Sequence, residues 1–256
     1  MARYDFRSPR LYVDTPLKAG GTIELDRSQA NYLLAVLRLK PGDAVLLFNG
    51  RDGEWRTTVG RASKRTSTLD IVEQTRPQTA PGDLHYLFAP LKHARLDYMV
   101  QKAVELGASR LQPVMTRHAQ AARINLERMR ANAIEAAEQC GILTLPEVAA
   151  PAEFSRITNG FDPQRLLVFC DENAEGDPVA TLTAVRERLG GVPPPLAVLI
   201  GPEGGFAEDE RAALLRLPNV VRLALGPRIL RADTAAVAAL GLVQAVLGDW
   251  GPTKPV

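Results

Sequence analysis

The chain has 256 residues, of which 46% are hydrophobic, enough for one large packed domain or two smaller ones. It has no run of about 18 apolar residues, so we expect no transmembrane helix. Charged residues occupy the amino-terminal stretch where a signal peptide would be apolar, so we expect a cytoplasmic protein.

The formal net charge is only +2, which by itself indicates no partner. Its distribution is more informative. Residues 1–76 carry 13 Lys and Arg against 9 Asp and Glu, whereas residues 146–256 carry 10 against 14. The amino-terminal part is therefore the better candidate for contact with phosphate groups.

The cysteines and histidines indicate no metal site. Cys140 and Cys170 are isolated and lack C-x-x-C spacing, so we expect two reduced thiols and no disulfide. The three histidines, His85, His93 and His118, do not have the spacing of metal ligands.

Residues 1–74 alternate short apolar runs with turn residues, which predicts a small β-barrel with one helix. The strands are expected over residues 10–13, 22–25, 44–48, 54–59 and 68–72. The helix is expected over residues 26–37, with Asp26 as its N-cap and Leu33 on its apolar face. Residues 75–83 contain two prolines and a glycine and are predicted to be a linker.

From residue 84 to residue 250, apolar runs of strand length alternate with helical patterns. Strands are predicted over 84–89, 110–115, 166–170 and 198–200 and from 220, and helices over 94–106, 125–139 and 232–247 and from Pro178. Right-handed units of this order give an α/β fold with helices on both faces of a parallel sheet. The helix over 232–247 is almost wholly apolar, more than one buried face needs, and this suggests a subunit interface.

The most informative run is VLIGPEGGFAEDE at residues 198–210. A buried strand ends at Gly201-Pro202, and Gly204-Gly205 permits close approach of a ligand. Phe206 provides an apolar anchor, and three acids follow in the first turn of a helix. A βα turn without a ligand fits this run about equally well, and its spacing matches neither the dinucleotide motif nor the P-loop.

A second loop of the same construction begins at residue 220 with VVRLALGPRILRADTAAVAAL. Gly226-Pro227 again ends a strand and precedes a helix. We expect the two loops to lie side by side at the carboxyl edge of a parallel sheet, where open α/β folds bind ligands.

The pair IGPEGGF and LGPRILRADTA resembles the two carboxyl-terminal motifs of SPOUT methyltransferases, and most closely those of the RsmE family. This resemblance implies methylation of N3 of a uridine in 16S ribosomal RNA, with S-adenosylmethionine as the methyl donor. It also implies a methyltransferase domain over residues 84–250 that contains a trefoil knot at about 166–250. SPOUT enzymes are typically homodimers, so the resemblance further implies a homodimer formed through the knot domain.

Other segments support the same family. YLLAVLRLKPGDAVLLFNGRDGEW resembles the amino-terminal PUA-like domain, which implies an RNA-binding domain over residues 1–74. KAVELG resembles another family element. The chain departs from the family pattern at Ile142, where we expect arginine, and at Asp233, where glutamate is usual.

The resemblance implies a set of cofactor-binding residues in the two loops. They are Leu199, Ile200, Gly201, Pro202, Gly204, Gly205, Leu225, Gly226, Ile229, Leu230, Arg231 and Thr234. They would present backbone groups and an apolar wall to the adenine and methionine parts of the cofactor. For the leucines and isoleucines, ordinary core packing is the competing interpretation.

Methylation of uracil N3 requires a proton to be removed or the uracil anion to be stabilised. We expect Arg231 to stabilise negative charge on the uracil or to bind the target phosphate. A salt bridge from Arg231 to Asp233 or to a neighbouring acid is an equally good interpretation. Glu203 and Asp233 are the other catalytic candidates, and Glu203 could instead cap the next helix.

In the amino-terminal domain, the family match favours Arg10, Arg38 and Lys40 as RNA-binding residues. Two alternatives stay open: a non-catalytic RNA-binding SPOUT protein, and a SPOUT methyltransferase with another RNA target. The intact glycine loops argue against the first alternative, and the amino-terminal barrel argues against the second.

Overall fold

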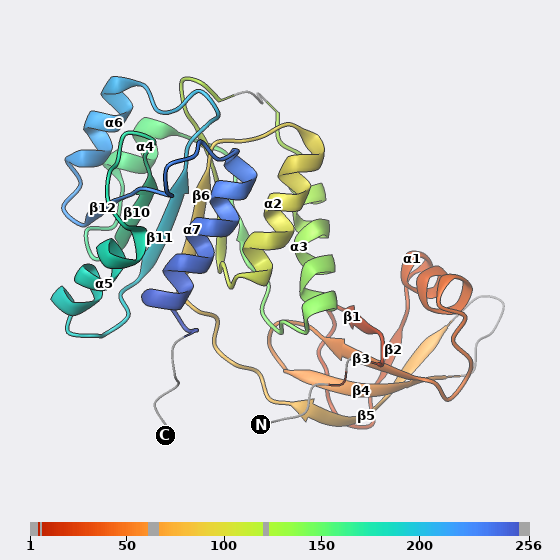
Figure 1. Ribbon diagram of the computed structural model, residues 1–256. Coiled ribbons are helices and arrows are strands. Elements are labelled where there is room, and N and C mark those ends of the chain that lie inside the picture. The colour runs from red at the N-terminus through yellow and green to blue at the C-terminus, as the bar shows by residue number, and fades with distance from the viewer. Residues whose placement is uncertain (1–4, 6, 61–66, 120–122, 251–256) are drawn as a thin grey trace. The chain divides into compact units, whose positions relative to one another are not determined.

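The computed structural model describes residues 5, 7–60, 67–119 and 123–250 (Figure 1). The chain forms two compact units. The first comprises Met1–Ala80 and Ile134–Leu145, and the second comprises Pro81–Ala133 and Pro146–Val256. The chain therefore enters the first unit twice, the second time through the end of helix α3, Leu126–Cys140.

The first unit contains a curled five-stranded sheet with the strand order β1-β3-β4-β5-β2. The strands are β1 Arg10–Tyr12, β2 Thr22–Glu24, β3 Ala44–Phe48, β4 Glu54–Val59 and β5 Thr68–Arg76. Only β1 and β3 pair in parallel. Val45, Leu47 and Leu69 are fully buried in its core, as alternation along the strands predicts. The last strand extends past residue 72 to Arg76.

The helix expected over residues 26–37 begins at its predicted cap. The Asp26 carboxylate accepts a hydrogen bond from the Gln29 amide at 2.8 Å, and the Gln29 side chain accepts one from the Asp26 amide at 3.1 Å. This reciprocal capping starts α1, Arg27–Ala30. The chain then continues as a π-helix, η1, Asn31–Val36, which sequence periodicity did not predict.

The π-turn sets which side chains of η1 face outward. The Leu37 amide donates to the Tyr32 carbonyl at 2.9 Å, one residue further back than in an α-helix. Leu33 is completely buried, whereas Tyr32 and Val36 are exposed. Arg38, two residues after the end of η1, has a positive φ of 58°, which is unusual for a residue other than glycine.

The second unit contains a parallel sheet in the order β12-β10-β11-β6-β7-β8, with β9 also pairing with β7. Its strands are β6 Leu84–Phe88, β7 Arg110–Met115, β8 Glu147–Val148, β9 Ala152–Glu153, β10 Leu166–Cys170, β11 Leu196–Ile200 and β12 Val220–Leu223. Strands β8 and β9 were not predicted, because two residues are too short to show a periodicity.

Helices cover both faces of this sheet, as predicted (Figure 1). They are α2 His93–Glu105, α3, α4 Phe154–Asn159, α5 Pro178–Arg188, α6 Glu208–Leu215 and α7 Ala232–Val246. Helix α7 packs against α2, α5 and β11. On the other face, Phe154 of α4 and Leu214 of α6 pack on Leu199 and Phe169. Among the described residues, no helix combines the length and apolar character that a membrane span requires.

Candidate active site

The two Gly-Pro loops do not follow neighbouring strands. Strand β10 lies between β11 and β12, with Val168 paired to Val198 on one side and to Val221 on the other. The expectation that the two loops leave neighbouring strands is therefore wrong, although both loops line one cavity. Connection length does not determine strand order, and the chain between β11 and β12 crosses over β10. A third loop, after β10, consequently lies at the same edge of the sheet.

The three loops enclose one cavity of about 210 Å³ at the carboxyl edge of the sheet. Most of the predicted cofactor-binding residues line it, namely Ile200, Gly201, Pro202, Gly205, Leu225, Gly226, Ile229 and Leu230. The others, Leu199, Gly204, Arg231 and Thr234, lie outside its lining. Leu199 instead points into the core on the face covered by α4 and α6.

The loop after β10 supplies a wall that the sequence analysis missed. Cys170, Asp171 and Glu172 all line the cavity. The Asp171 carboxylate accepts hydrogen bonds from the Nε atoms of Arg211 and Arg222 at 2.8 and 2.9 Å. The acidic run directly after the buried strand 166–170 was the signal available in the sequence.

Charge and burial shift two pKa values in this loop. Burial by itself raises the pKa of Asp171, but hydrogen bonds from Arg211, the Asn173 amide and Arg222 outweigh it, and the net pKa is lowered. Burial raises the pKa of the Cys170 thiol to about 12. Cys170 is therefore a neutral wall of the cavity at physiological pH.

The loop after β11 is anchored by Phe206, as predicted. Its ring packs in the core with Phe154 and Phe169, at centroid distances of 6.4 and 6.0 Å. A Cβ added at Gly201 would lie 2.9 Å from this ring, so the close approach of the ring requires a glycine there. Apolar packing of Phe206 therefore anchors the loop to the core.

Hydrogen bonds also hold the loop after β11 in place. Glu210 accepts hydrogen bonds from the amides of Ala207 at 3.0 Å and Arg117 at 2.8 Å. The Nδ1 atom of His118 lies 3.1 Å from the carbonyl oxygen of Gly205. The predicted acidic first turn of α6 is confirmed. Its third acid, Glu210, connects the loop after β11 to the loop after β7 through these two hydrogen bonds.

The three catalytic candidates differ in position. Glu203 lines the cavity and forms an ion pair with Arg95 at 3.3 Å. Arg231 is exposed at the N-cap of α7, and neither it nor Asp233 lines the cavity. Asp233 accepts a hydrogen bond from the Thr234 amide at 2.9 Å. Among the described residues no ion pair joins Arg231 to Asp233, so that competing interpretation finds no support.

Family models match both parts of the chain. A model of an RNA methyltransferase domain matches residues 78–244, and a model of an RNA methyltransferase PUA domain matches residues 25–72. Ribosomal RNA small subunit methyltransferase E of Synechocystis is 30% identical over 88% of this chain and 74% of its own length. The chain belongs to the RsmE family of RNA methyltransferases.

Other RsmE proteins match over nearly their whole length. The enzyme of Rickettsia conorii is 29% identical over 92% of this chain and 94% of its own. The solved RsmE of Neisseria gonorrhoeae bound to S-adenosylmethionine has a TM-score of 0.77 and 25% identity, and covers 95% of this chain and 100% of its own. The solved structure of a methyltransferase from Legionella pneumophila with bound S-adenosylmethionine has a TM-score of 0.78 and 27% identity. It covers 93% of this chain and 98% of its own.

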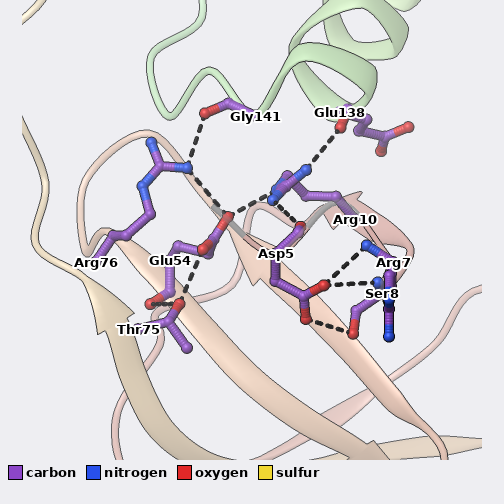
Figure 2. A network of polar contacts seen from close by, with 9 residues as sticks. All are labelled: Asp5, Arg7, Ser8, Arg10, Glu54, Thr75, Arg76, Glu138 and Gly141. Carbon is purple, nitrogen blue, oxygen red and sulfur yellow. Dashed lines mark hydrogen bonds and ion pairs between the residues drawn. The ribbon is translucent and has the colours of Figure 1, made fainter. Parts of the chain in front are cut away.

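In the first unit of this RsmE chain, Arg10 is buried, contrary to its predicted contact with RNA. The side chains of Arg10 and Glu54 are only 4% and 2% exposed and form an ion pair at 2.7 Å. Figure 2 shows that Arg10 also donates to the main chain of Asp5 and Glu138, while Arg76 contacts Glu54. Arg10 is committed to this buried network, so it has no guanidinium available for RNA.

The other two predicted RNA-binding residues, Arg38 and Lys40, are exposed. They follow η1, whose Tyr32 and Val36 are 41% and 61% exposed, and its C-cap Leu37, which is 38% exposed. We call these five residues the η1 surface. It combines cations with an aromatic ring, the two kinds of group that contact single-stranded RNA.

A second cavity, of about 380 Å³, lies in the first unit. It is lined by Ser8, Pro9, Arg10, Tyr32, Glu135, Glu138 and Gln139. Burial raises the pKa of Glu138, and the nearby Glu135 carboxylate raises it further, although a hydrogen bond from the Tyr12 amide opposes them. Two carboxyl groups in one wall make this cavity a poor site for phosphate.

No group of three or more His, Cys, Asp or Glu side chains suited to a metal ion occurs in the part of the chain that the structure describes.

Proposed function

We propose that the protein methylates N3 of a uridine in 16S ribosomal RNA and uses S-adenosylmethionine as the donor. The observation that carries this proposal is the single cavity formed by three loops at the carboxyl edge of an RNA methyltransferase sheet. Two relatives of the same fold, at 25% and 27% identity, are solved with S-adenosylmethionine.

The lining of the cavity suits this cofactor. Ile200, Leu225 and Leu230 provide an apolar wall of the kind that adenine requires. Gly226 has a φ value of 88°, and a Cβ there would meet nothing within 4 Å, so its main-chain groups can approach the ligand closely. The cofactor would therefore be held largely through main-chain groups, as the family resemblance implies.

When bound, S-adenosylmethionine supplies an electrophilic methyl group on a sulfonium. The residues of the chain must align the acceptor nitrogen with that methyl group and stabilise the loss of its proton. We assign the stabilisation of the uracil anion to Arg231, which is exposed beside the cavity at the start of α7. Glu203 is the weaker candidate for the base, because it would first have to leave its ion pair with Arg95.

The Arg231→Ala variant tests this assignment. Loss of a group that stabilises developing charge typically lowers kcat by about 10²- to 10³-fold. The affinity for S-adenosylmethionine, measured by calorimetry, should stay close to that of the wild type. Arg216→Ala removes another exposed arginine of the second unit and serves as the control. A normal methylation rate in Arg231→Ala would remove the assignment.

We further propose that residues 1–74 bind the RNA and that the η1 surface makes the contact. Removal of one cation that binds a phosphate should reduce the slope of log affinity against log salt by about 1. Arg38→Ala and Lys40→Ala should therefore each flatten that slope. Arg51→Ala is the control, because Arg51 is exposed in the same unit but is paired with Asp14 at 2.9 Å. If the slope is unchanged in both variants, neither residue binds a phosphate of the RNA, and the proposed contact is refuted.

The knot over residues 166–250 and the homodimer remain proposals based on the family resemblance. Helix α7 buries Ala236, Ala239 and Val243 within its own chain and leaves Val237 and Leu242 partly exposed. The partly exposed stripe is the part of α7 available to a second subunit. Sedimentation equilibrium of Leu242→Glu against the wild type tests this role, and dimers of equal stability would exclude the stripe.

Mapping of methylated uridines in 16S RNA from a deletion strain decides between the RNA targets. The absence of one methylated uridine, restored by the gene, supports the proposal. Titration with S-adenosylmethionine decides against the non-catalytic alternative if binding is observed together with methyl transfer. A complete set of methylated uridines in the deletion strain would refute the proposed target.

A further inference from the structure

Two adjacent acids in the loop after β10 have opposite surroundings. Asp171 is 6% exposed, whereas its neighbour Glu172 is exposed on the wall of the cavity. Because their side chains leave the backbone in different directions, one can stabilise the loop while the other faces a ligand.

Asp171 is fully engaged within the protein. One of its oxygens accepts from Arg211 and Arg222, and the other accepts from the Asn173 amide at 3.0 Å. Arg222 also donates to the Asn173 carbonyl oxygen at 2.8 Å. These bonds fix the turn over residues 171–174, and they fix the direction in which Glu172 leaves the backbone.

Glu172 lies against the first Gly-Pro loop. If Gly205 carried a Cβ, that atom would be 2.7 Å from Oε1 of Glu172. The carboxylate therefore occupies the space that the missing side chain of Gly205 leaves. Both residues line the cavity, so the carboxylate stands where the loops after β10 and β11 meet.

Glu172 has no partner, unlike the other acids of the cavity. Within the residues that the structure describes, its carboxylate makes no hydrogen bond and no ion pair. Asp171 has two arginines, and Glu203 has Arg95. Among these three acids of the cavity wall, Glu172 is therefore the one whose oxygens can accept hydrogen bonds from a ligand.

We propose that Glu172 is a ligand-binding residue that accepts hydrogen bonds from the ribose hydroxyls of the adenosyl ligand. This inference rests on the function proposed above. A carboxylate with two free oxygens can accept from both hydroxyls of a ribose at once, and carboxylates bind nucleotide ribose in the same way in dinucleotide folds. An exposed carboxylate attracts a cation weakly, because solvent screens the charge, so the two hydroxyls are its better partner.

The experiment compares Glu172→Ala with the wild type by calorimetric titration of three ligands. They are S-adenosylmethionine, S-adenosylhomocysteine, which lacks the sulfonium charge, and methylthioadenosine, which lacks the amino-acid group. A contact to the ribose predicts an equal loss of affinity for all three, by about 10- to 100-fold. A loss confined to S-adenosylmethionine would assign the residue to the sulfonium. A loss for S-adenosylmethionine and S-adenosylhomocysteine without a loss for methylthioadenosine would assign it to the ammonium. Either result overturns the proposal.

A ligand analogue without the ribose hydroxyls gives the matching test. It should bind the wild type weakly, and Glu172→Ala should weaken it no further, because the partner of the carboxylate is already absent. Glu175→Ala, an exposed acid of the same loop outside the cavity lining, should bind all ligands like the wild type. Thermal unfolding of each variant verifies that it folds.

The outcomes also separate this inference from the proposed function. If the wild type binds none of the three ligands, the proposed function fails. If the wild type binds them and Glu172→Ala binds them equally well, only the role of Glu172 fails. If Glu172→Ala keeps its affinity but loses turnover, the residue acts in the chemical step and the ribose contact is refuted.

Discussion

The carboxylate of Asp171 illustrates how a single residue can organise a site through bonds within the protein. It joins the loop after β10 to Arg211 of α6 and to Arg222 of β12. These two elements flank the first and second Gly-Pro loops. One buried charge therefore links all three walls of the cavity, and each wall depends on that charge for its position.

Asp171→Asn should weaken these links and lower stability by about 2 kcal/mol at neutral pH, the usual range for hydrogen bonds to a charged group. The folded-state pKa of Asp171 is lowered, so its contribution is fully present above the unfolded value of about 3.9. The contribution is lost as the pH falls through the lower folded value. Urea unfolding at pH 7 and pH 3 should therefore show a smaller difference between variant and wild type in acid. An equal difference at both pH values would show that the charge is not responsible.

The Cys170 thiol should resist alkylation. Its pKa is raised to about 12 by burial, so the reactive thiolate is scarce at pH 8. The stability that comes from keeping this thiol neutral is present below the unfolded pKa of about 8.5 and declines as the pH rises towards 12. Iodoacetamide at pH 8 should label the exposed Cys140 much faster than Cys170, as read by peptide mass spectrometry. Equal rates would contradict the enclosure of Cys170.

At the scale of elements, strand β4 and the end of α3 are held together inside the first unit by charges. Glu54 of β4 contacts Arg10 and Arg76, and these arginines donate to the carbonyl oxygens of Glu138 and Gly141 (Figure 2). The carboxylate is the centre of the network, because both guanidinium groups contact it. The network is one of the contacts that join residues 134–145 to the rest of the first unit.

Glu54→Ala should be strongly destabilising, by about 3–5 kcal/mol, because it leaves the buried guanidinium of Arg10 without a counter-charge. Glu73→Ala is the matched control from the neighbouring strand. Its ion pair with Arg56 is 3.6 Å long, and the two side chains are 58% and 48% exposed, so its removal should cost less than about 1 kcal/mol. Chemical denaturation of both variants measures the difference, and similar decreases in stability would show that burial does not govern these pairs.

For the whole molecule, we predict that S-adenosylmethionine protects parts of one unit. Saturation at 100 times Kd should stabilise the binding-competent state by about 2.7 kcal/mol. Hydrogen exchange should slow in the loops over 171–174, 201–207 and 224–231, which line the cavity. Exchange in strands β3 and β4 of the first unit should not change. Protection centred on the first unit would place the cofactor in its larger cavity instead.

Local chemistry made much of the fold predictable from the sequence. The strands β3, β4, β7 and β10 have the predicted bounds. Turn residues fix both ends of β3, which follows Gly42-Asp43 and precedes Asn49-Gly50. Asp177 accepts from the amides of Val179 and Ala180, and it starts α5 where a cap followed by proline predicts. Most of the predicted cofactor-binding residues also line the cavity, because the glycine motifs mark two of its three loops.

The tertiary structure alone decided how these pieces meet. Strand order placed β10 between the two glycine loops and so brought in Asp171 and Glu172, because pairing across a sheet depends on contacts distant in sequence. The position of Arg10 in the fold places it in a buried ion pair with Glu54 and not in contact with RNA. The sequence does not predict this, because a buried and an exposed arginine have the same chemical groups. The sequence by itself determined the elements, the family and the position of the ligand loops. Which charges are paired and which are left for a ligand depends on distances that only the folded chain sets.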